Sequence, residues 1–184
     1  MLQTYIHPEE LAYNGVELRP HFILSQFKQE GSTLASFTGP CLVLTEHLVD
    51  WEDRLVNDHI KAKTMVHFLG EFFGATLKEG LWMQRLLVSL AQGWIQRHGV
   101  NVTRSGDDLY FVAKKLSVSV VTISPVSVLL HFGVNVDPEG APVNAGGLLE
   151  LGIDPKELVK DLLTEFQQEY KSISKASVKV RAVI

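Results

Sequence analysis

The chain has 184 residues, of which 46% are hydrophobic and 21% are charged, and its formal net charge at pH 7 is −4. This length and composition fit one globular domain over residues 1–184 and exclude a disordered or repetitive chain. The acidic balance argues against duplex nucleic acid and anionic membranes as partners. The single cysteine, Cys41, excludes an internal disulfide and, with no signal-peptide pattern in the first ten residues, favours a cytoplasmic protein.

The first 49 residues predict a sheet edge or meander. Apolar runs typical of strands lie at residues 2–6, 22–27 and 41–49. Between them, clusters of Gly, Pro, Asn and Ser predict turns at residues 14–15, 30–32 and 39–40.

Two helices are predicted next. The first begins at Asp50, whose carboxylate can cap free backbone amides, and is predicted to run to Phe73. Its second half carries an apolar face at helical spacing, made by Met65, Val66, Phe68, Leu69, Phe72 and Phe73. The second helix is predicted over residues 78–98, ending before Gly99. Its polar side chains occupy a narrow strip, so we expect this helix to be mostly buried.

Four strands follow, at residues 101–104, 108–113, 115–123 and 126–136. The last two lie in a segment, 116–136, that carries no Asp, Glu, Lys or Arg and is long enough to raise the question of a membrane span. Pro125 lies in the middle of this segment, which is rich in Val, Ile and Thr. We therefore interpret it as two buried strands joined by a turn.

A final helix is predicted to begin at Asp154, with Pro155 at its first position and Glu157 three residues after the cap. The terminal segment 178–184 alternates like a half-exposed strand. Strands, two helices, strands, a helix and a strand together predict an α+β fold with a mostly antiparallel mixed sheet, packed by about three helices.

A polar strip on the two central strands is the first candidate site. Alternate positions of these strands carry small or polar residues, namely Lys115, Ser117, Ser119, His131, Gly133 and Asn135. If both strands present these positions on the same side of the sheet, they form a shallow floor with room for a ligand. The alternative is a sheet face that is simply exposed to water.

The order of short motifs resembles the catalytic domain of biotin and lipoate protein ligases. The matching pieces, within residues 80–172, are Asp107-Asp108-Leu109-Tyr110, then Lys115-Leu116, and later Gly133-Val134-Asn135-Val136. The whole chain also resembles a small prokaryotic family of unknown function placed beside these ligases. The resemblance implies a ligase-like fold with a site where a carboxylic acid and ATP form an acyl-adenylate. It further implies that Asp108 binds nucleotide or ligand, and that Lys115 and Arg104 hold carboxylate or phosphate.

The sequence also departs from the ligase pattern. It contains no Gly-x-Gly, whereas these ligases close a glycine-rich loop over the adenylate. Asp107 replaces the usual asparagine, and His131 stands where the later motif has its first glycine. Related acyltransferases use a cysteine nucleophile after the Asn-Val motif, but here Cys41 lies far earlier.

The predicted helix over residues 50–73 holds further candidates. Asp58 falls within its apolar face, so it either lies in the exposed first turns or faces the pocket. His67 and Glu71 are four residues apart, and we interpret them as a surface hydrogen-bonded pair rather than as metal ligands. No metal site is predicted.

Three functional hypotheses follow. The first is a ligase-like or transferase-like enzyme acting on a small carboxylic acid or acyl group, with Lys115 as electrostatic stabiliser and ATP or AMP as the candidate cofactor. The second is a non-catalytic small-ligand-binding or regulatory domain. The third is a structural protein at a subunit interface, such as that of a homodimer. Fold-level resemblance does not choose among them.

Overall fold

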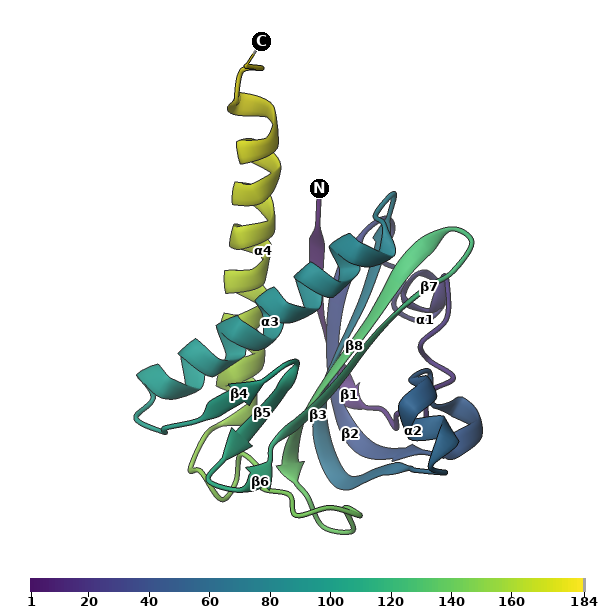
Figure 1. The fold of residues 1–184 in the computed structure, drawn as a ribbon, viewed down its shortest axis with the longest axis vertical. Helices are drawn as coiled ribbons and strands as arrows, with labels where there is room; N and C mark the ends of the chain where they lie inside the picture. Colours follow the sequence, from purple (N-terminus) through teal and green to yellow (C-terminus); the bar gives the residue numbers. More distant parts are fainter. Residues whose placement is uncertain (184) are drawn as a thin grey trace.

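The computed structural model describes residues 1–183 and has the predicted α+β fold (Figure 1). Its elements in chain order are β1 (Gln3–Glu10), α1 (Phe22–Phe27), β2 (Thr33–Val43), the short 3-10 helix η1 (Thr45–His47), α2 (Trp51–Leu55), β3 (Ile60–Phe73), α3 (Leu77–Arg97), β4 (Thr103–Ser105), β5 (Asp108–Phe111), β6 (Lys114–Lys115), β7 (Ser117–Ile123), β8 (Ser127–Asp137) and α4 (Pro155–Lys179). Within the described residues, one sheet has the order β1-β2-β3-β8-β7 and a smaller one the order β4-β5-β6. Only the β1–β2 pair is parallel there, which confirms the mostly antiparallel mixed sheet.

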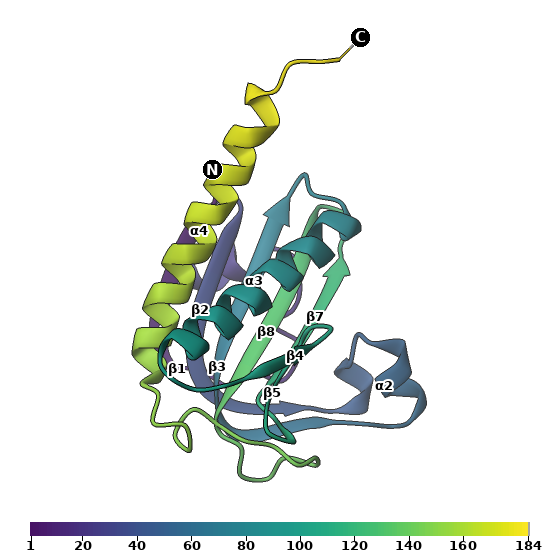
Figure 2. The ribbon, with the colours of Figure 1, turned by 60° about the vertical axis from the view of Figure 1, so that its left-hand side comes forward.

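Two hydrophobic cores lie on opposite faces of the larger sheet. Helices α3 and α4 cover one face, as Figure 2 shows, and the N-terminal segment with α1 packs on the other. The central strand β3 contributes to both cores, because neighbouring side chains of a strand point to opposite faces. Phe68 is buried in the first core and Leu69 in the second.

The predicted helix from Asp50 to Phe73 is wrong beyond Leu55. Asp50 caps α2, accepting a hydrogen bond from the Glu52 amide at 2.7 Å, but the helix ends after 5 residues and β3 begins at Ile60. Strand β3 is the middle strand and is buried on both faces over most of its length, so apolar residues follow one another without alternation. Such a run cannot be distinguished from a helix face by periodicity alone.

Helix α1 occupies a segment for which the sequence predicts a strand. Phe22, Ile23 and Phe27 are buried, while the three residues between Ile23 and Phe27 are exposed. This spacing places the buried side chains on one face of a short helix. His21 and Lys28 adopt left-handed backbone conformations at its two ends, with φ of 62° and 58°.

Two further local predictions are wrong. Strand β2 continues through residues 39–40 instead of turning, with an irregularity in its pairing to β3 between Gly39 and Cys41. Pro40, which has no amide hydrogen, is tolerated at such a bulge. At the other end, α4 continues to Lys179 and residues 180–183 form no strand; Ile184 lies outside the described residues.

The predictions for α3 and for the start of α4 are confirmed. Thr76 and Glu79 form a capping box before α3, and Asp154 caps α4 with Pro155 in its first turn. Only one face of α3 is buried, however, and Trp82 on the other face is 63% exposed. The uncharged segment 116–136 forms β7 and β8, and no helix in residues 1–183 is long and apolar enough to cross a membrane.

Candidate functional site

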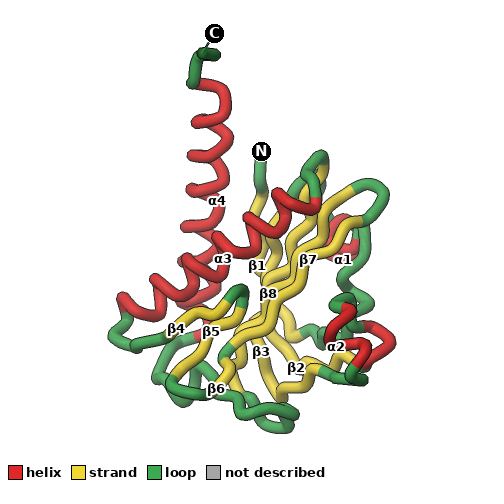
Figure 3. Tube along the Cα trace, in the orientation of Figure 1, coloured by secondary structure: helices red, strands yellow, loops and turns green. Residues whose placement is uncertain are grey.

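A cavity of about 240 Å³ lies between the β2–β3 connection, the β5–β6 hairpin and the loop after β8. Figure 3 places α2 beside the ends of β2 and β3, where the connection forms one wall. Polar residues lining the cavity are Tyr13, His47, Asp50, Asp53, Asp58, His59, Lys61, Asp107, Asp108, Lys115, Ser119, His131 and Asn135. Its volume lies just below the range of about 300–1,000 Å³ for drug-sized ligands, so it suits a small metabolite.

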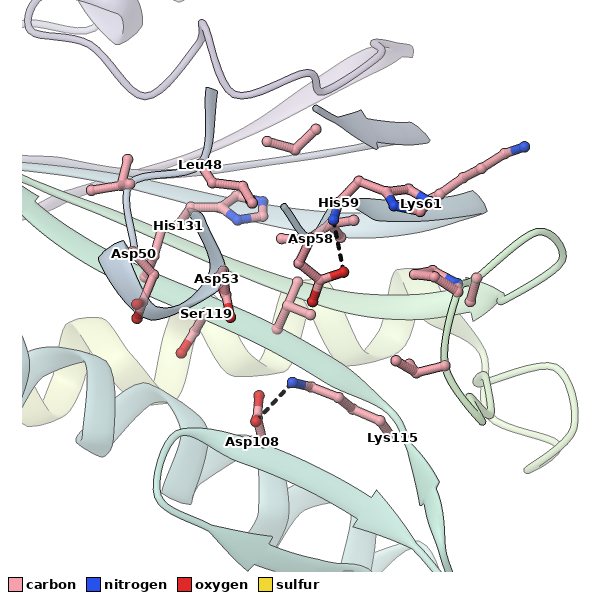
Figure 4. A pocket seen from close by; sticks show the side chains of 18 of the residues that line it. Leu48, Asp50, Asp53, Asp58, His59, Lys61, Asp108, Lys115, Ser119 and His131 are labelled. Atoms are coloured by element: carbon pink, nitrogen blue, oxygen red, sulfur yellow. Dashed lines mark hydrogen bonds and ion pairs between the residues drawn. The ribbon is translucent and has the colours of Figure 1, made fainter. Parts of the chain in front are cut away.

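Lys115 and Asp108 form an ion pair in this cavity (Figure 4). Strands β5 and β6 pair Tyr110 with Lys115, and this register brings the Lys115 Nζ to 2.8 Å from Asp108 Oδ2. Burial lowers the pKa of Lys115, but the hydrogen bond and charge of Asp108 outweigh it and raise the pKa above its usual value. Lys115 is therefore a fixed cation, whereas the neighbouring Lys114 pairs with Glu150.

Asp107 has a different set of partners from its neighbour. Its carboxylate accepts hydrogen bonds from Gln84 Nε2 at 2.9 Å, from Ser119 Oγ at 2.8 Å and from an Arg85 guanidinium nitrogen at 2.7 Å. These donors come from α3 and β7, so Asp107 fixes the β4–β5 hairpin to both elements. The hairpin in turn carries Asp108 into the cavity.

Three more carboxylates reach the cavity from the α2 side. Asp50 and Asp58 each accept a local backbone hydrogen bond, from the amides of Glu52 and His59. Burial raises the pKa of Asp53, and the negative charges of Asp50 and Asp58 raise it further. Figure 4 shows these three carboxylates pointing toward the side of the pocket where the Lys115–Asp108 pair lies.

His131 and Tyr13 line the inner wall of the cavity, and His67 contacts both rings. The His131 ring stacks on Tyr13 with 3.9 Å between ring centroids, and its Nε2 lies 3.1 Å from Nδ1 of His67. The Nε2 of His67 lies 3.3 Å from the carbonyl oxygen of Gly39. Burial lowers the pKa of His67 to about 3, and burial together with the neighbouring His67 lowers the pKa of His131 well below its usual value. Both imidazoles are therefore neutral at pH 7.

Asn135 ties the loop after β8 to the base of the pocket. Its side-chain amide donates to the carbonyl oxygens of Lys115 at 3.2 Å and Gly146 at 3.1 Å. The Gly146 amide donates back to the Lys115 carbonyl at 3.1 Å. Asn135 thus positions the backbone that carries Lys115.

Most of the sequence-predicted residues lie at this cavity. Those that line it are Asp58, Asp107, Asp108, Lys115, Ser119, His131 and Asn135. Arg104, Ser117 and Gly133 do not line it. Arg104 is exposed and donates to the Gly106 carbonyl, and the buried Ser117 hydroxyl accepts the Leu109 amide. The ligand-binding roles of the lining residues stay predictions.

The expectation of one shared polar face on β7 and β8 is wrong. Strand pairing places Val120 opposite His131 and Ser119 opposite Phe132. Because directly paired residues point to the same side of a sheet, Ser119 and His131 belong to opposite faces. Ser119 still reaches the cavity, because the cavity extends around the open edge of β7 to Asp107.

The interpretation of His67 and Glu71 as a surface pair is also wrong. Both side chains are buried on β3, His67 at 0% and Glu71 at 2% exposure. Glu71 accepts the His21 amide and the Ser127 hydroxyl, while His67 contacts His131. Residues 1–183 hold no cluster of three His, Cys, Asp or Glu side chains suited to a metal ion.

Sequence reasoning missed Asp53 and Tyr13 as lining residues and assigned Asp50 only to helix capping. Their place at the cavity depends on tertiary structure, because they join it only when the β2–β3 connection folds over the edge of the sheet. The only local signal, which applies to Asp50 and Asp53, was the presence of four acids within the nine residues from Asp50 to Asp58.

Relatives of the chain match nearly all or all of its length. Residues 2–181 match the family DUF366, described as a domain of unknown function. A solved protein of unknown function from Pyrococcus horikoshi is 35% identical, with a TM-score of 0.95 over 100% of both chains. An uncharacterized protein of Methanocaldococcus jannaschii is 32% identical over 174 residues, which are 91% of this chain and 79% of that one.

Two solved ligases share the fold at low identity. A biotin protein ligase mutant from Aquifex aeolicus in complex with biotin is 14% identical, with a TM-score of 0.57 over 94% of this chain and 72% of that one. A putative lipoate protein ligase from T. acidophilum with bound lipoic acid is 11% identical, with a TM-score of 0.55 over 91% and 84%. The predicted biotin/lipoate ligase-like fold is confirmed.

Proposed function

This chain belongs to the DUF366 family of domains of unknown function, and from that premise we propose that its pocket binds a small carboxylic acid or acyl compound and acts on the acyl group as a transferase or ligase. The observation that carries the proposal is the Lys115–Asp108 ion pair, a fixed cation inside a cavity of metabolite size. The ligase-like fold supports the same reading as analogy.

Lys115 has the chemistry for acyl transfer. When a nucleophile attacks an acyl carbon, negative charge develops on the acyl oxygen, and a preorganised cation lowers the energy of that charge. Asp108 keeps Lys115 protonated, and the Asn135 amide holds its backbone in place. A free carboxylate ligand would meet the same Nζ as its counter-ion.

The lining fits a nucleotide triphosphate poorly. Five aspartates and two lysines line the cavity, so a polyphosphate would be repelled. The sequence has no Gly-x-Gly to wrap a phosphate, and the volume is below that of drug-sized sites. Transfer from an already activated acyl compound, such as an ester or thioester, is therefore the version of the proposal that the residues support.

A second candidate is a binding domain without catalysis. It is favoured by the same ion pair, because Asp108 already neutralises much of the charge that Lys115 would offer to a reacting oxygen. In this version Lys115 orients a carboxylate but does not accelerate a reaction.

Ligand binding is tested by thermal denaturation with biotin, lipoate, octanoate and 6-aminohexanoate, and with ATP and AMP. A ligand that binds only the folded state raises the free energy of unfolding, by about 2.7 kcal/mol at a ligand concentration a hundredfold above Kd, and therefore raises the Tm. We expect a rise with at least one acid, lost in Lys115→Ala but kept in Lys114→Ala. No rise with any acid would contradict the proposal.

Catalysis is tested by hydrolysis or transfer of p-nitrophenyl acyl esters. We expect Lys115→Ala to lower kcat by about tenfold or more, with Lys114→Ala as the matched control. Equal rates for both variants would support the binding domain instead. ATP–pyrophosphate exchange by the intact protein would show adenylation and contradict the transferase version.

A further inference from the structure

We propose that the small acyl compound of this pocket also carries a protonated amino group, which the aspartates on the α2 side receive, while the free ring nitrogen of His131 accepts a further hydrogen bond from the ligand. The inference rests on the proposed function and names the substrate class: an amino acid or another acyl compound with an ammonium group. It also rests on acceptor atoms of the cavity wall that receive no hydrogen bond, or only one, from the described residues.

The His67–His131 pair has one arrangement of protons when both rings are neutral. The Gly39 carbonyl can only accept, so Nε2 of His67 carries the hydrogen and Nδ1 of His67 does not. Nδ1 of His67 must then accept a hydrogen bond, which Nε2 of His131 donates across 3.1 Å. His131 consequently has its hydrogen on Nε2 and a bare, accepting Nδ1.

That accepting nitrogen faces the cavity. His131 is only 3% exposed and lines the pocket, and none of the described residues forms a hydrogen bond with its Nδ1. Within residues 1–183, a side-chain nitrogen or oxygen that is both shielded from solvent and without a hydrogen-bond partner occurs only in His7, Ser36 and Gln84. Nδ1 of His131 has no partner in this range and does not belong to this set, so it is not shielded. Nδ1 of His131 is therefore open to the pocket, and a buried acceptor without a partner favours a ligand that donates.

Asp53 is a second acceptor without a partner in residues 1–183, and it is partly buried and can carry a negative charge. Its carboxylate has no hydrogen bond or ion pair among the described residues, while Asp50 and Asp58 are each only partly satisfied by one amide. Lys115, whose positive charge acts on Asp53, is already paired with Asp108. An ammonium group bound at Asp53 would give this carboxylate a counter-ion and hydrogen-bond donors, and the neighbouring charges of Asp50 and Asp58 would favour it further.

The two ends of the ligand are placed by opposite walls. Figure 4 shows Asp50, Asp53 and Asp58 on one side and Lys115 on the other. A zwitterionic compound meets both, with its ammonium group at the aspartates and its carboxylate or acyl oxygen at Lys115. An anion without an amino group meets Lys115 but is repelled by the aspartates.

Calorimetric titration with four six-carbon compounds separates these interactions: hexanoate, hexylamine, 6-aminohexanoate and norleucine. We expect one of the two amino acids to bind at least tenfold more tightly than hexanoate, which equals about 1.4 kcal/mol. Equal or tighter binding of hexanoate would overturn the inference and leave the proposed function standing. Hexylamine binding as tightly as both amino acids would support amine recognition and contradict a role for Lys115 in binding the acyl end. Absence of binding by all four would count against both.

Two pairs of variants locate the groups. Asp53→Asn should weaken amino acid binding about tenfold and strengthen hexanoate binding, because it removes a charge that repels the anion, whereas Glu52→Gln, an exposed neighbour outside the lining, should change neither. His131→Asn can place its amide oxygen near the position of Nδ1, and His131→Gln can reach only that of Nε2. We expect the first to retain more affinity than the second, with thermal denaturation to verify that both fold.

A divalent cation is the competing occupant. If Mg²⁺ or Ca²⁺ alone binds the protein, and Asp53→Asn abolishes that binding, the carboxylates form a metal site and the amine proposal is overturned. If neither ion competes with the tighter-binding amino acid, the proposal is supported.

Discussion

Asp107 and Asp108 are adjacent in the chain, yet their carboxylates bind different cations: Asp107 lies 2.7 Å from Arg85, and Asp108 lies 2.8 Å from Lys115. The first contact fixes the β4–β5 hairpin to α3, and the second sets the charge of the pocket. One residue therefore acts on stability and the other on the electrostatics of the site, so the effects of replacing each can be measured separately.

Replacing Asp108 with asparagine should lower the pKa of Lys115. Burial already lowers that pKa, and the hydrogen bond and negative charge of Asp108 are the main influences that raise it. Without the carboxylate, the desolvation of the ammonium group is opposed only by weaker contributions. NMR titration of the methylated lysine side chain measures the shift. Asp107→Asn serves as the control, and an unchanged pKa in Asp108→Asn would contradict the assignment of the ion pair.

Replacing Asp107 with asparagine should destabilise the domain by about 1–3 kcal/mol, because the new NH₂ group would face donors that now have an acceptor. Gln84, one of these donors, is only 3% exposed, so water cannot readily replace the carboxylate as the acceptor of its hydrogen bond. For a chain of this size, the loss corresponds to a fall in Tm of about 2–4 °C per kcal/mol. Urea denaturation measures it. The exposed Arg104→Ala should stay within about 0.5 kcal/mol of the native protein.

The stability of the protein should fall as the pH is lowered from 7 toward 5.5. An unfolded histidine takes up a proton near pH 6.5, but burial holds the pKa of His67 at about 3 and that of His131 well below its usual value. The unfolded state therefore binds more protons below pH 6.5, and stability decreases by up to about 1.4 kcal/mol per pH unit for each histidine. Denaturant titrations at several pH values measure the slope.

His67→Gln is the informative variant for this slope, because it removes one buried histidine. Its stability should depend less steeply on pH than that of the native protein. His59→Gln makes the same substitution at an exposed histidine and is the control, because it removes an imidazole that is not buried. A native slope that equals that of His67→Gln would contradict the neutral, buried state of the pair.

The sequence predicts the hairpin part of the site better than the rest. Asp107, Asp108 and Lys115 lie close together in the chain, in and beside strands β5 and β6, so local spacing brings them together. The contact between His67 and His131 depends instead on the pairing of β3 with β8, 64 residues apart, and no local pattern encodes it. The same strand β3 was the main error in the predicted fold, since burial on both faces removes the alternation that identifies a strand.

Gly39 should not tolerate a side chain. A Cβ at this position would lie 2.1 Å from the carbonyl oxygen of Leu11, which is backbone and cannot move away cheaply. The Gly39 carbonyl also accepts from His67, so a shift of β2 would disturb the histidine pair. We expect Gly39→Ala to lower the free energy of unfolding by about 1–3 kcal/mol.

Gly93→Ala is the matched control. Its Cβ would meet only Arg97 at 3.5 Å, and alanine inside α3 should stabilise the protein by up to about 1 kcal/mol. Urea denaturation of the two variants tests both signs, and a neutral Gly39→Ala would show that β2 and the Leu11 segment can separate without loss.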